Sequence, residues 1–472
     1  MTNMKDFALG GNKLGPVVIA FSERASGESA WLILGLPGAA ILGGFLESWT
    51  VIGCVSGIIF SWFMIATKLR NATGHYNAIT LPELFSKIFG NSKSIQIIAS
   101  TIITFFFTFY VAAQFAGAGK VLNVTFGIPE TQGMLLGAVL IVFYTLMGGF
   151  LAVAWTDLVQ GIIMIATLVI LPLVAWIELG DSLVFENFFS SATFIGETQG
   201  WAAITLVIGG LSWGLGYMGQ PHLVSRYMAI DKVENIKLGR RIAISWAVPA
   251  FIGSMLIGVF GKELILSGKV MIDGVLVNGI NDLKMLISNG FLDPEKLMPA
   301  MATALLNPWV AGILISGAIA AMMSTADSQL LVSTTVLTED IVGRFWRNSV
   351  QNFNLLTIGR MLTVIIGVVA FFLAYESKEM VFEMVSYAWG GLGASFGPAL
   401  LLTLWWKKTS KIGVISGMIT GTLFTVIDLF GAWVTVRFSA FVLALIAVIL
   451  GSLIGDENRV ENSDTIKNQN NA

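Results

Sequence analysis

About twelve apolar stretches, each long enough to cross a membrane, account for most of this 472-residue sequence. A helix needs about 20 apolar residues to span the hydrocarbon core, whereas a barrel strand needs only about ten that alternate in polarity. The stretches here are of the long, continuous kind, so the sequence predicts an all-α polytopic membrane protein. We place its helices at 13–44 (broken), 46–70, 93–122, 132–152, 153–178, 198–221, 239–266, 306–336, 355–374, 381–406, 411–430 and 434–455.

Composition agrees with a membrane protein and excludes several functions. Hydrophobic residues make up 55% of the chain and charged residues only 12%, about half the charged share of a soluble domain. A net charge of -2 and scattered basic residues give no sign of a nucleic-acid partner. Cys54 has no second cysteine to pair with, and His75 and His222, which we expect to be solvated in or beside loops, do not suggest a metal site. No nucleophile–base pair or phosphate loop is present, so we do not expect an enzyme.

The connections between the predicted helices differ in charge, and this predicts the orientation of the chain. Lys and Arg gather in alternate connections, which should be cytoplasmic: Lys68, Arg70, Lys87, Lys93, Arg226, Lys232, Lys237, Arg240, Arg241, Arg344, Arg347, Lys407, Lys408 and Lys411. The N-terminal segment 1–12 and the polar, disordered tail 456–472 are then both cytoplasmic. The long connection 267–299 lies on the opposite side and could hold short helices at 282–287 and 295–298.

A charged segment interrupts the first apolar stretch. Glu23, Arg24 and Glu28 lie within 22–31, together with Gly27. Charged side chains are costly in lipid, and irregular backbone is tolerated at membrane depth only where it faces protein or water. We therefore expect this segment to face the interior and to leave the helical path to hold a ligand.

The sixth stretch is also interrupted, by three glycines and Pro221 in the segment 213–221. It lies five helices after the first, and an odd spacing inverts the topology. Two broken helices at matching positions of two halves are typical of inverted-repeat transporters whose site lies near mid-membrane. Close helix packing is an alternative explanation for the glycines, although a proline at this position favours a break.

The eighth stretch carries the strongest chemical signal. Ser324, Asp327 and Ser328 share one helix face, and their oxygens suit a hard cation such as sodium. Buried hydroxyls often bond their own backbone instead, but a carboxylate at membrane depth needs a cation or proton. A second acid, Asp157, is either another buried ligand or the N-cap of the fifth helix.

Four aromatic residues within predicted spans could wall a solute pocket, with polar ring atoms as handles: Trp31, Tyr110, Trp213 and Tyr217. Aromatic residues are abundant in this chain, so packing or an interface belt is the alternative for any one of them.

Five segments of the sequence are highly specific: LGLPGA (34–39), YTLMGGFLAVAWTD (144–157), WGLGYMGQPH (213–222), NPWVAGILIS (307–316) and VSYAWGGLGASFGP (385–398). Through these segments, nearly the whole chain resembles the sodium/solute symporter family, in particular its bacterial sodium/proline symporters. The resemblance implies a LeuT-type 5+5 inverted-repeat fold with alternating access, in a bacterial plasma (inner) membrane. The repeats would be 13–178 and 198–406, followed by two additional helices in 411–455.

The resemblance also implies sites. The common sodium site would use carbonyls of Ala25, Glu28 and Ala321 with the hydroxyls of Ser324 and Thr325. A second cation site would use Asp157, Ser324, Asp327 and Ser328, and the solute site Ser29, Trp31, Tyr110, Trp213, Tyr217 and Pro221. We therefore expect sodium-coupled uptake of a small amino acid, with L-proline first. One alternative is a sodium symporter of the same family for another solute, namely another amino acid, a monocarboxylate or a sugar acid, with a proton involved through Glu28. Another alternative, from a different class, is a channel or a sensor.

The sequence departs from that family in two ways. Family members usually have one more helix before the position of Asp6, and this sequence begins after it. Proline symporters also have an acid where Gly27 stands, an apolar residue at Glu28 and a small one at Arg24. Moving the acid by one place would rotate it by about 100° on a helix. Glu28 then either assists cation coupling or meets the ammonium of the solute, or it forms a structural pair with Arg24 at the cytoplasmic mouth.

Overall fold

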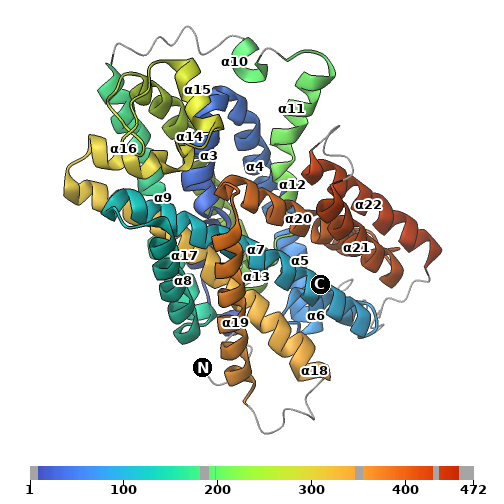
Figure 1. The fold of residues 1–472 in the computed structure, drawn as a ribbon. Coiled ribbons are helices and arrows are strands. Elements are labelled where there is room, and N and C mark those ends of the chain that lie inside the picture. The colour runs from blue at the N-terminus through green and yellow to red at the C-terminus, as the bar shows by residue number, and fades with distance from the viewer. Residues whose placement is uncertain (1–8, 181–190, 197, 346–353, 429–434, 456–472) are drawn as a thin grey trace.

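The first membrane helix is interrupted where it carries charge. The computed structural model describes residues 9–180, 191–196, 198–345, 354–428 and 435–455, and Figure 1 shows that helices dominate them. After the short turn η1 (Gly10–Asn12), α2 (Pro16–Gly27) ends at a glycine, and Glu28 leaves the helical path with φ -103° and ψ 49°. The chain then continues as the π-helical η2 (Trp31–Gly35) and α3 (Leu36–Gly43). The expected break is confirmed.

The elements up to the first long connection follow in chain order. They are η3 (Gly44–Glu47), α4 (Ser48–Phe60), η4 (Ser61–Ile65), α5 (Ala66–Tyr76), α6 (Leu81–Ile88), α7 (Lys93–Phe126), α8 (Glu130–Met147) and α9 (Phe150–Leu179). Of these, α4, η4 and α5 run on without a gap. Ser92 and Thr80 cap α7 and α6 through their hydroxyls, as expected for helix starts.

The remaining elements begin with a second interrupted helix. It comprises α11 (Trp201–Leu211), α12 (Trp213–Gly216) and α13 (Pro221–Ala229), and it bends by 42° at the break. The other elements are α10 (Ser191–Ile195), η7 (Val233–Asn235), α14 (Ile236–Leu266), α15 (Ile280–Ser288), η8 (Pro294–Lys296), α16 (Leu297–Leu305), α17 (Pro308–Thr335), η9 (Val336–Val342), α18 (Gly343–Phe345), α19 (Leu355–Glu376), α20 (Val381–Trp405), α21 (Lys411–Ile427) and α22 (Val436–Ile454).

Helices occupy all twelve of the predicted stretches. Within the described residues, eight helices are long and apolar enough to cross a membrane, or up to nine if the bent pair is counted as one span. That count joins Trp31–Tyr76 into one helix, although this range holds the end of the first predicted span, from residue 31 on, and all of the second. It also leaves out α20, and α21 falls among the shorter apolar helices. The structure is thus an all-α bundle of the predicted class.

A close backbone contact holds the second broken helix in place. A Cβ added to Gly57 of α4 would lie 2.2 Å from the carbonyl oxygen of Gly214 in α12. A Cβ on Gly53, one turn earlier, would lie 2.7 Å from the carbonyl oxygen of Gly210. Small residues allow such backbone approach in membranes. Close packing and a break, which the sequence offered as alternatives for these glycines, therefore occur together.

Three details differ from the sequence-based expectation. The fourth and fifth helices are separated at Gly148 and Gly149 rather than near residue 152. Asp157 consequently lies inside α9, two turns from its start, and the N-cap interpretation is wrong. The chain also resumes a helix at Pro221, whose missing N–H costs nothing at a helix start, so His222 and Arg226 are buried in α13 rather than solvated in a loop.

The long connection 267–307 is fastened to the bundle by buried ion pairs. Glu295 lies 2.6 Å from Lys120 Nζ of α7 and accepts hydrogen bonds of 2.8 Å from the backbone N–H groups of Val381 and Phe382 at the start of α20. A carboxylate at a helix N-terminus is favourable. Burial nevertheless raises the pKa of Glu295 above its ordinary value, and the Lys120 ammonium opposes that shift.

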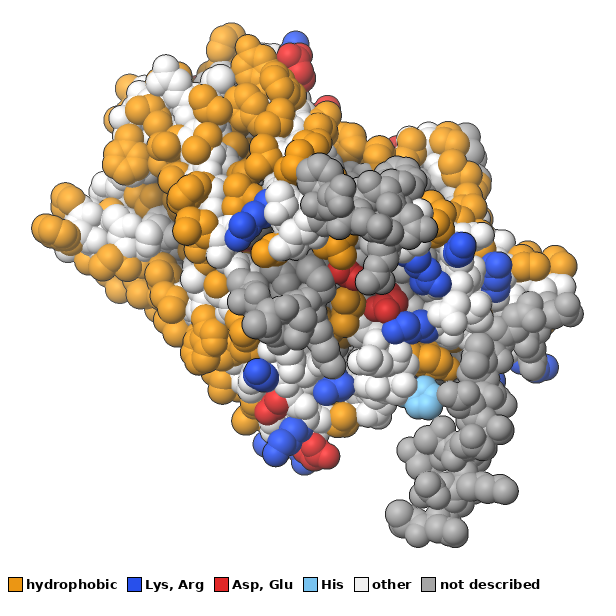
Figure 2. Space-filling view, turned by 90° about the horizontal axis from the view of Figure 1, so that it is seen from below, with side chains coloured by type: hydrophobic (Ala, Val, Ile, Leu, Met, Phe, Trp, Pro, Cys, Tyr) orange, Lys and Arg blue, Asp and Glu red, His pale blue; other side chains and the backbone are white. Residues whose placement is uncertain are grey.

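Basic side chains gather at the opposite end of the bundle. Figure 2, which views the molecule from below, shows Lys and Arg across this end and hydrophobic side chains along the adjoining side. Arg226, which the sequence placed among the basic residues of these connections, is instead fully buried. The tail 456–472 lies outside the described residues.

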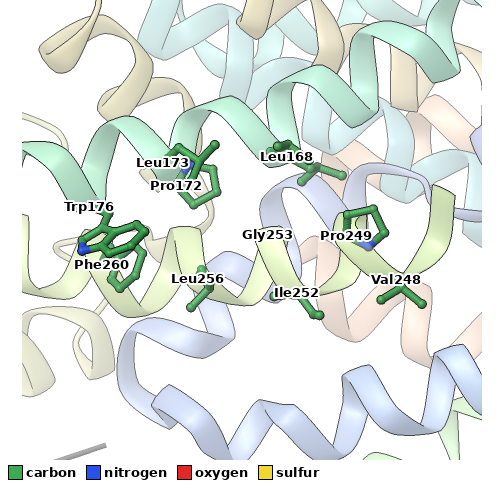
Figure 3. Close-up of a pocket in the computed structure, with 11 residues that line it drawn as sticks. Leu168, Pro172, Leu173, Trp176, Val248, Pro249, Ile252, Gly253, Leu256 and Phe260 are labelled. Atoms are coloured by element: carbon green, nitrogen blue, oxygen red, sulfur yellow. The ribbon is translucent and has the colours of Figure 1, made fainter. Parts of the chain in front are cut away.

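An apolar groove runs along the outer surface between α9 and α14 (Figure 3). It has a volume of about 470 Å³ and is lined by Leu168, Val169, Pro172, Leu173, Trp176, Val248, Pro249, Ile252, Gly253, Leu256 and Phe260. Several of these side chains are exposed, including Trp176 and Leu173. The lining offers no charged or hydroxyl group, so this groove does not suit a charged solute.

Candidate functional site

The break after α2 leaves backbone oxygens without partners in their own helix. Arg24 O accepts a hydrogen bond from Glu28 N, the last bond of α2. The carbonyls of Ala25 and Ser26 follow it in the final turn, where helical carbonyls have no intrahelical donor. Gln114 of α7 holds the chain beyond the break, because its side-chain oxygen accepts from Ala30 N at 3.0 Å. The negative end of the α2 dipole therefore faces a fixed interior position.

Hydroxyl groups of α17 meet these carbonyl oxygens. Ser324 Oγ lies 2.9 Å from Ala25 O and 3.1 Å from Ala321 O, and Thr325 Oγ1 lies 3.0 Å from Ser26 O. All of these residues are buried. The cluster consists only of neutral oxygens, from the C-terminal turn of α2 and the middle of α17, and neutral oxygens are the ligand type that suits a hard monovalent cation.

This cluster contains four of the five residues predicted for the common sodium site, namely Ala25, Ala321, Ser324 and Thr325. The fifth, Glu28, lies at the break, and its side chain turns to other partners. The carbonyl of Ser26 belongs to the cluster and was missed. Its only signal in the sequence is its position between Ala25 and the break.

Three buried charges lie beside the cluster. Arg24 binds Glu23 through Nε at 2.6 Å and through Nη2, and its Nη1 lies 2.7 Å from Glu28 Oε1. Trp62 Nε1 and Tyr227 OH also donate to Glu23, at 3.2 and 3.1 Å. The Arg24–Glu28 pair therefore forms, but in the interior of the bundle rather than at its mouth. With all three side chains ionised, the trio carries one net negative charge.

Aromatic side chains adjoin Glu28 on the other side. The indoles of Trp31 and Trp213 stack with their centroids 4.6 Å apart and 15° between their planes. Tyr217 OH donates to both carboxylate oxygens of Glu28, at 2.9 and 3.0 Å. Ser29 Oγ lies 3.4 Å from Tyr110 OH. The structure thus gathers five of the six predicted solute residues around the break.

The sixth, Pro221, opens α13 and lines a different small cavity with Leu81 and Leu331. Trp389 of α20 was missed and closes the aromatic group instead. Its ring lies 4.7 Å from that of Tyr217, and its Nε1 donates to Trp213 O at 2.9 Å. The glycine-rich segment 385–398 that contains Trp389 was the signal available for it.

These aromatic side chains have almost no solvent contact. Trp31, Tyr110 and Trp389 are 0% exposed, and Trp213 and Tyr217 are 1% exposed. A solute can therefore occupy this position only after some of them move. The structure represents a conformation in which the site is closed to both ends of the bundle.

A polar cavity lies next to this closed site. It has a volume of about 460 Å³, and its lining includes Glu383, Ser386, Tyr387, Asp428 and Arg437. The guanidinium of Arg437 lies 4.4 Å from the centroid of the Trp213 ring. This cavity thus ends at one wall of the aromatic group and has the charged lining that the outer groove lacks.

Three of the four residues predicted for a second cation site lie together beside Arg226, and the fourth, Ser324, belongs to the oxygen cluster at Ala25. Ser324 faces Ala25, whereas Asp157 and Ser328 contact Arg226, at 3.2 and 2.5 Å. Asp327 accepts from Ser328 Oγ at 3.3 Å. From the sequence alone, Arg226 was assigned to a loop. A buried Asp157 needs a cation as partner, and this requirement is the signal in the sequence that points to a buried arginine.

Comparison with known proteins identifies the architecture. The sequence pattern of the sodium:solute symporter family matches residues 7–421. The chain belongs to this family. It is 35% identical to the sodium/proline symporter of Escherichia coli (strain K12) over 462 residues, which cover 96% of this chain and 88% of that protein. It is 36% identical to the high-affinity proline transporter of Bacillus subtilis (strain 168), over 96% of this chain and 91% of the other.

Solved structures agree on the fold. A sodium-coupled sialic acid symporter in a substrate-bound, outward-open state superposes with a TM-score of 0.74 at 15% identity, over 96% of this chain and 93% of the other. A second transporter, MhsT in complex with L-phenylalanine, gives a TM-score of 0.54 at 13% identity, over 92% and 98% of the two chains. The symporter is a multi-pass membrane protein of the LeuT fold, and sodium is an ion that its family carries.

Proposed function

We propose that this symporter moves L-proline into the cell together with sodium. The observation that carries the proposal is the break after α2, where a cluster of neutral oxygens and an aromatic group share the segment Ala25–Trp31. The names of the two relatives, both above one third identity, support proline as the solute.

The residues of the break can couple the two ligands. Sodium at Ala25, Ser26, Ala321, Ser324 and Thr325 would tie the end of α2 to α17. A solute against Trp31 and Tyr217 would depend on the same turn being ordered. Coupling between two ligands is reciprocal, so each should raise the affinity for the other.

The charge of the interior suits a zwitterionic solute. With all three side chains ionised, Glu23, Arg24 and Glu28 leave one negative charge unmatched at the edge of the aromatic group, and the ammonium of an amino acid would match it. Glu28, through its contact with Tyr217, is the carboxylate nearest that group. Arg437 in the adjoining cavity is placed to attract the solute carboxylate before entry.

The sodium gradient is sufficient to drive accumulation. One sodium ion moving down a potential of about 100 mV releases about 2.3 kcal/mol, which corresponds to roughly fifty-fold accumulation before any concentration difference is counted. No covalent step is needed, because ligand binding only has to shift the populations of outward- and inward-open states.

We also propose the orientation and the internal symmetry. Residues 13–178 and 198–406 form the two inverted repeats, and 411–455 are additional helices. Both termini are cytoplasmic in a bacterial inner membrane. The basic residues at one end of the bundle (Figure 2) and the bacterial source of the relatives support this arrangement.

The test is uptake of radiolabelled L-proline into proteoliposomes, with and without an inward sodium gradient. We expect uptake that saturates, requires sodium and is abolished by a sodium ionophore. Unlabelled amino acids, a monocarboxylate and a sugar acid are added as competitors. If one of those solutes shows sodium-driven uptake and proline does not, that solute replaces proline in the proposed function. Sodium-independent or non-saturable flux would refute the symporter mechanism for this chain.

A further inference from the structure

A buried arginine occupies the centre of the predicted second cation site. Arg226 is 0% exposed and lies in α13, just beyond the second break. Its Nη2 donates to Ser328 Oγ at 2.5 Å, to Ser26 Oγ at 2.8 Å and to Asp157 Oδ2 at 3.2 Å. These three oxygens come from α17, α2 and α9, the helices that would have to supply ligands for a cation here.

The rest of the guanidinium is also engaged. Nε donates to Ser22 Oγ at 3.1 Å, and Nη1 donates to His222 O at 2.9 Å. The ring centroid of Phe150 lies 5.2 Å away and covers the group. Since a guanidinium offers five N–H donors in one plane, this set of acceptors fixes both the position and the orientation of the charge.

Asp157 is organised around that charge. Its Oδ2 accepts from Ser22 Oγ at 2.6 Å and from Ser26 Oγ at 3.1 Å, in addition to Arg226. A buried carboxylate needs one cation, and arginine supplies a permanent one because it does not deprotonate in proteins. A sodium ion at the same oxygens would have to share them with a like charge at hydrogen-bond distance.

We propose that Arg226 is a built-in cation that fills the second cation site of this symporter, so that each solute moves with one sodium ion. The inference rests on the proposed function and specifies its stoichiometry. It also changes the role of Asp157, which becomes the counter-ion of Arg226 and is no longer a sodium ligand. Arg226 is then a positioning residue that holds α13 against α2, α9 and α17.

The stoichiometry is measured on the unmodified protein. Initial rates of ²²Na⁺ and labelled proline entry are compared in the same proteoliposomes, and we expect a ratio of one and a Hill coefficient of one for sodium. Oδ1 of Asp157 and Oδ2 of Asp327 have no hydrogen-bond partner among the described residues, and these are the oxygens that would be open to a second sodium. A ratio of two would overturn the inference, whereas the absence of sodium-driven proline uptake would refute the proposed function instead.

A double-mutant cycle tests the pairing itself. Asp157→Asn alone should lower uptake at least tenfold, because it leaves the guanidinium buried without a counter-ion. Asp157→Asn combined with Arg226→Gln should recover a large part of that loss. If Asp157 were a sodium ligand, the double variant would transport no better than Asp157→Asn, and the inference would fail.

Arg226→Gln by itself frees the carboxylate for a second ion. We expect its flux ratio to rise above one, and its unfolding midpoint in detergent to depend more steeply on sodium than that of the parent protein. Arg226→Lys keeps the charge and should keep a ratio of one. A ratio that stays at one in folded Arg226→Gln would contradict exclusion by Arg226, and if that variant does not fold, the ratio of the unmodified protein decides.

Discussion

The hydroxyl of Thr325 offers a direct test of the sodium site. Thr325→Val removes the hydroxyl and nearly keeps the shape of the side chain. The group is fully buried and donates to Ser26 O at 3.0 Å. The substitution should therefore act on the oxygen cluster and not on exposed surface.

The expected loss of sodium-binding free energy in Thr325→Val follows from two opposing contributions. A hydrogen-bonding group that contacts a charge contributes about 1.5–3 kcal/mol, and a neutral hydrogen bond about 1 kcal/mol. Because the hydroxyl bonds Ser26 O when sodium is absent, the variant loses an interaction in both states. The net loss in sodium binding is then about 0.5–2 kcal/mol, and we expect roughly a tenfold rise in the half-saturating sodium concentration.

Two assays separate binding from transport. The first is proline uptake against sodium concentration at saturating proline. The second is the unfolding midpoint in detergent against sodium without proline, in which a tenfold weaker site loses about 1.4 kcal/mol of ligand stabilisation at saturating sodium. Thr325→Ser, which keeps the hydroxyl, is the matched control and should resemble the parent protein. An unchanged sodium dependence in Thr325→Val would refute the assignment, and an equal defect in Thr325→Ser would assign the effect to the lost methyl group.

Three further predictions concern charge, pH and packing. Glu28→Gln should raise the apparent KM for proline about tenfold and leave the sodium dependence intact; unchanged KM in uptake assays would remove the ammonium-binding role. Burial raises the pKa of Glu295 above 4.5, so the folded state holds this proton more tightly than the unfolded chain. Stability should therefore fall as pH rises above that value, and Glu295→Gln should flatten this part of a thermal unfolding profile against pH. Gly57→Ala places a methyl group 2.2 Å from Gly214 O and should cost about 1–3 kcal/mol of stability, whereas Gly312→Ala, which meets nothing within 4 Å, should be nearly neutral in the same melt.

The sequence predicted the helices and most of one site. Hydropathy located all twelve helical stretches because the cost of exposing backbone in lipid allows few alternatives. The break at Gly27 was predictable because Glu23, Arg24 and Glu28 could not face lipid. Ser324 was identified because it shares a helix face with Asp327 and Ser328 and because the chain resembles the family. The structure places it against Ala25.

Other assignments failed where a residue depended on distant segments. The basic character of Arg226 suggested a cytoplasmic loop, because the rule that assigns loops counts charges and does not see where a helix resumes. Asp157 was compatible with an N-cap until the helix start was known to lie at Phe150. Trp389 was hidden within a glycine-rich segment whose contacts involve another broken helix.

What the sequence by itself determined is that the charged groups within apolar stretches, such as Glu23, Arg24, Glu28 and Asp327, must lie in the interior, because the transfer of each charge into lipid has a cost that depends mainly on that group. Only the tertiary structure decided which interior groups meet. Arg226 and Asp157 are separated by 69 positions, and Ser324 and Ala25 by 299. These pairings depend on how α2, α9, α13 and α17 pack together, and the packing places a guanidinium where the sequence predicted a cation.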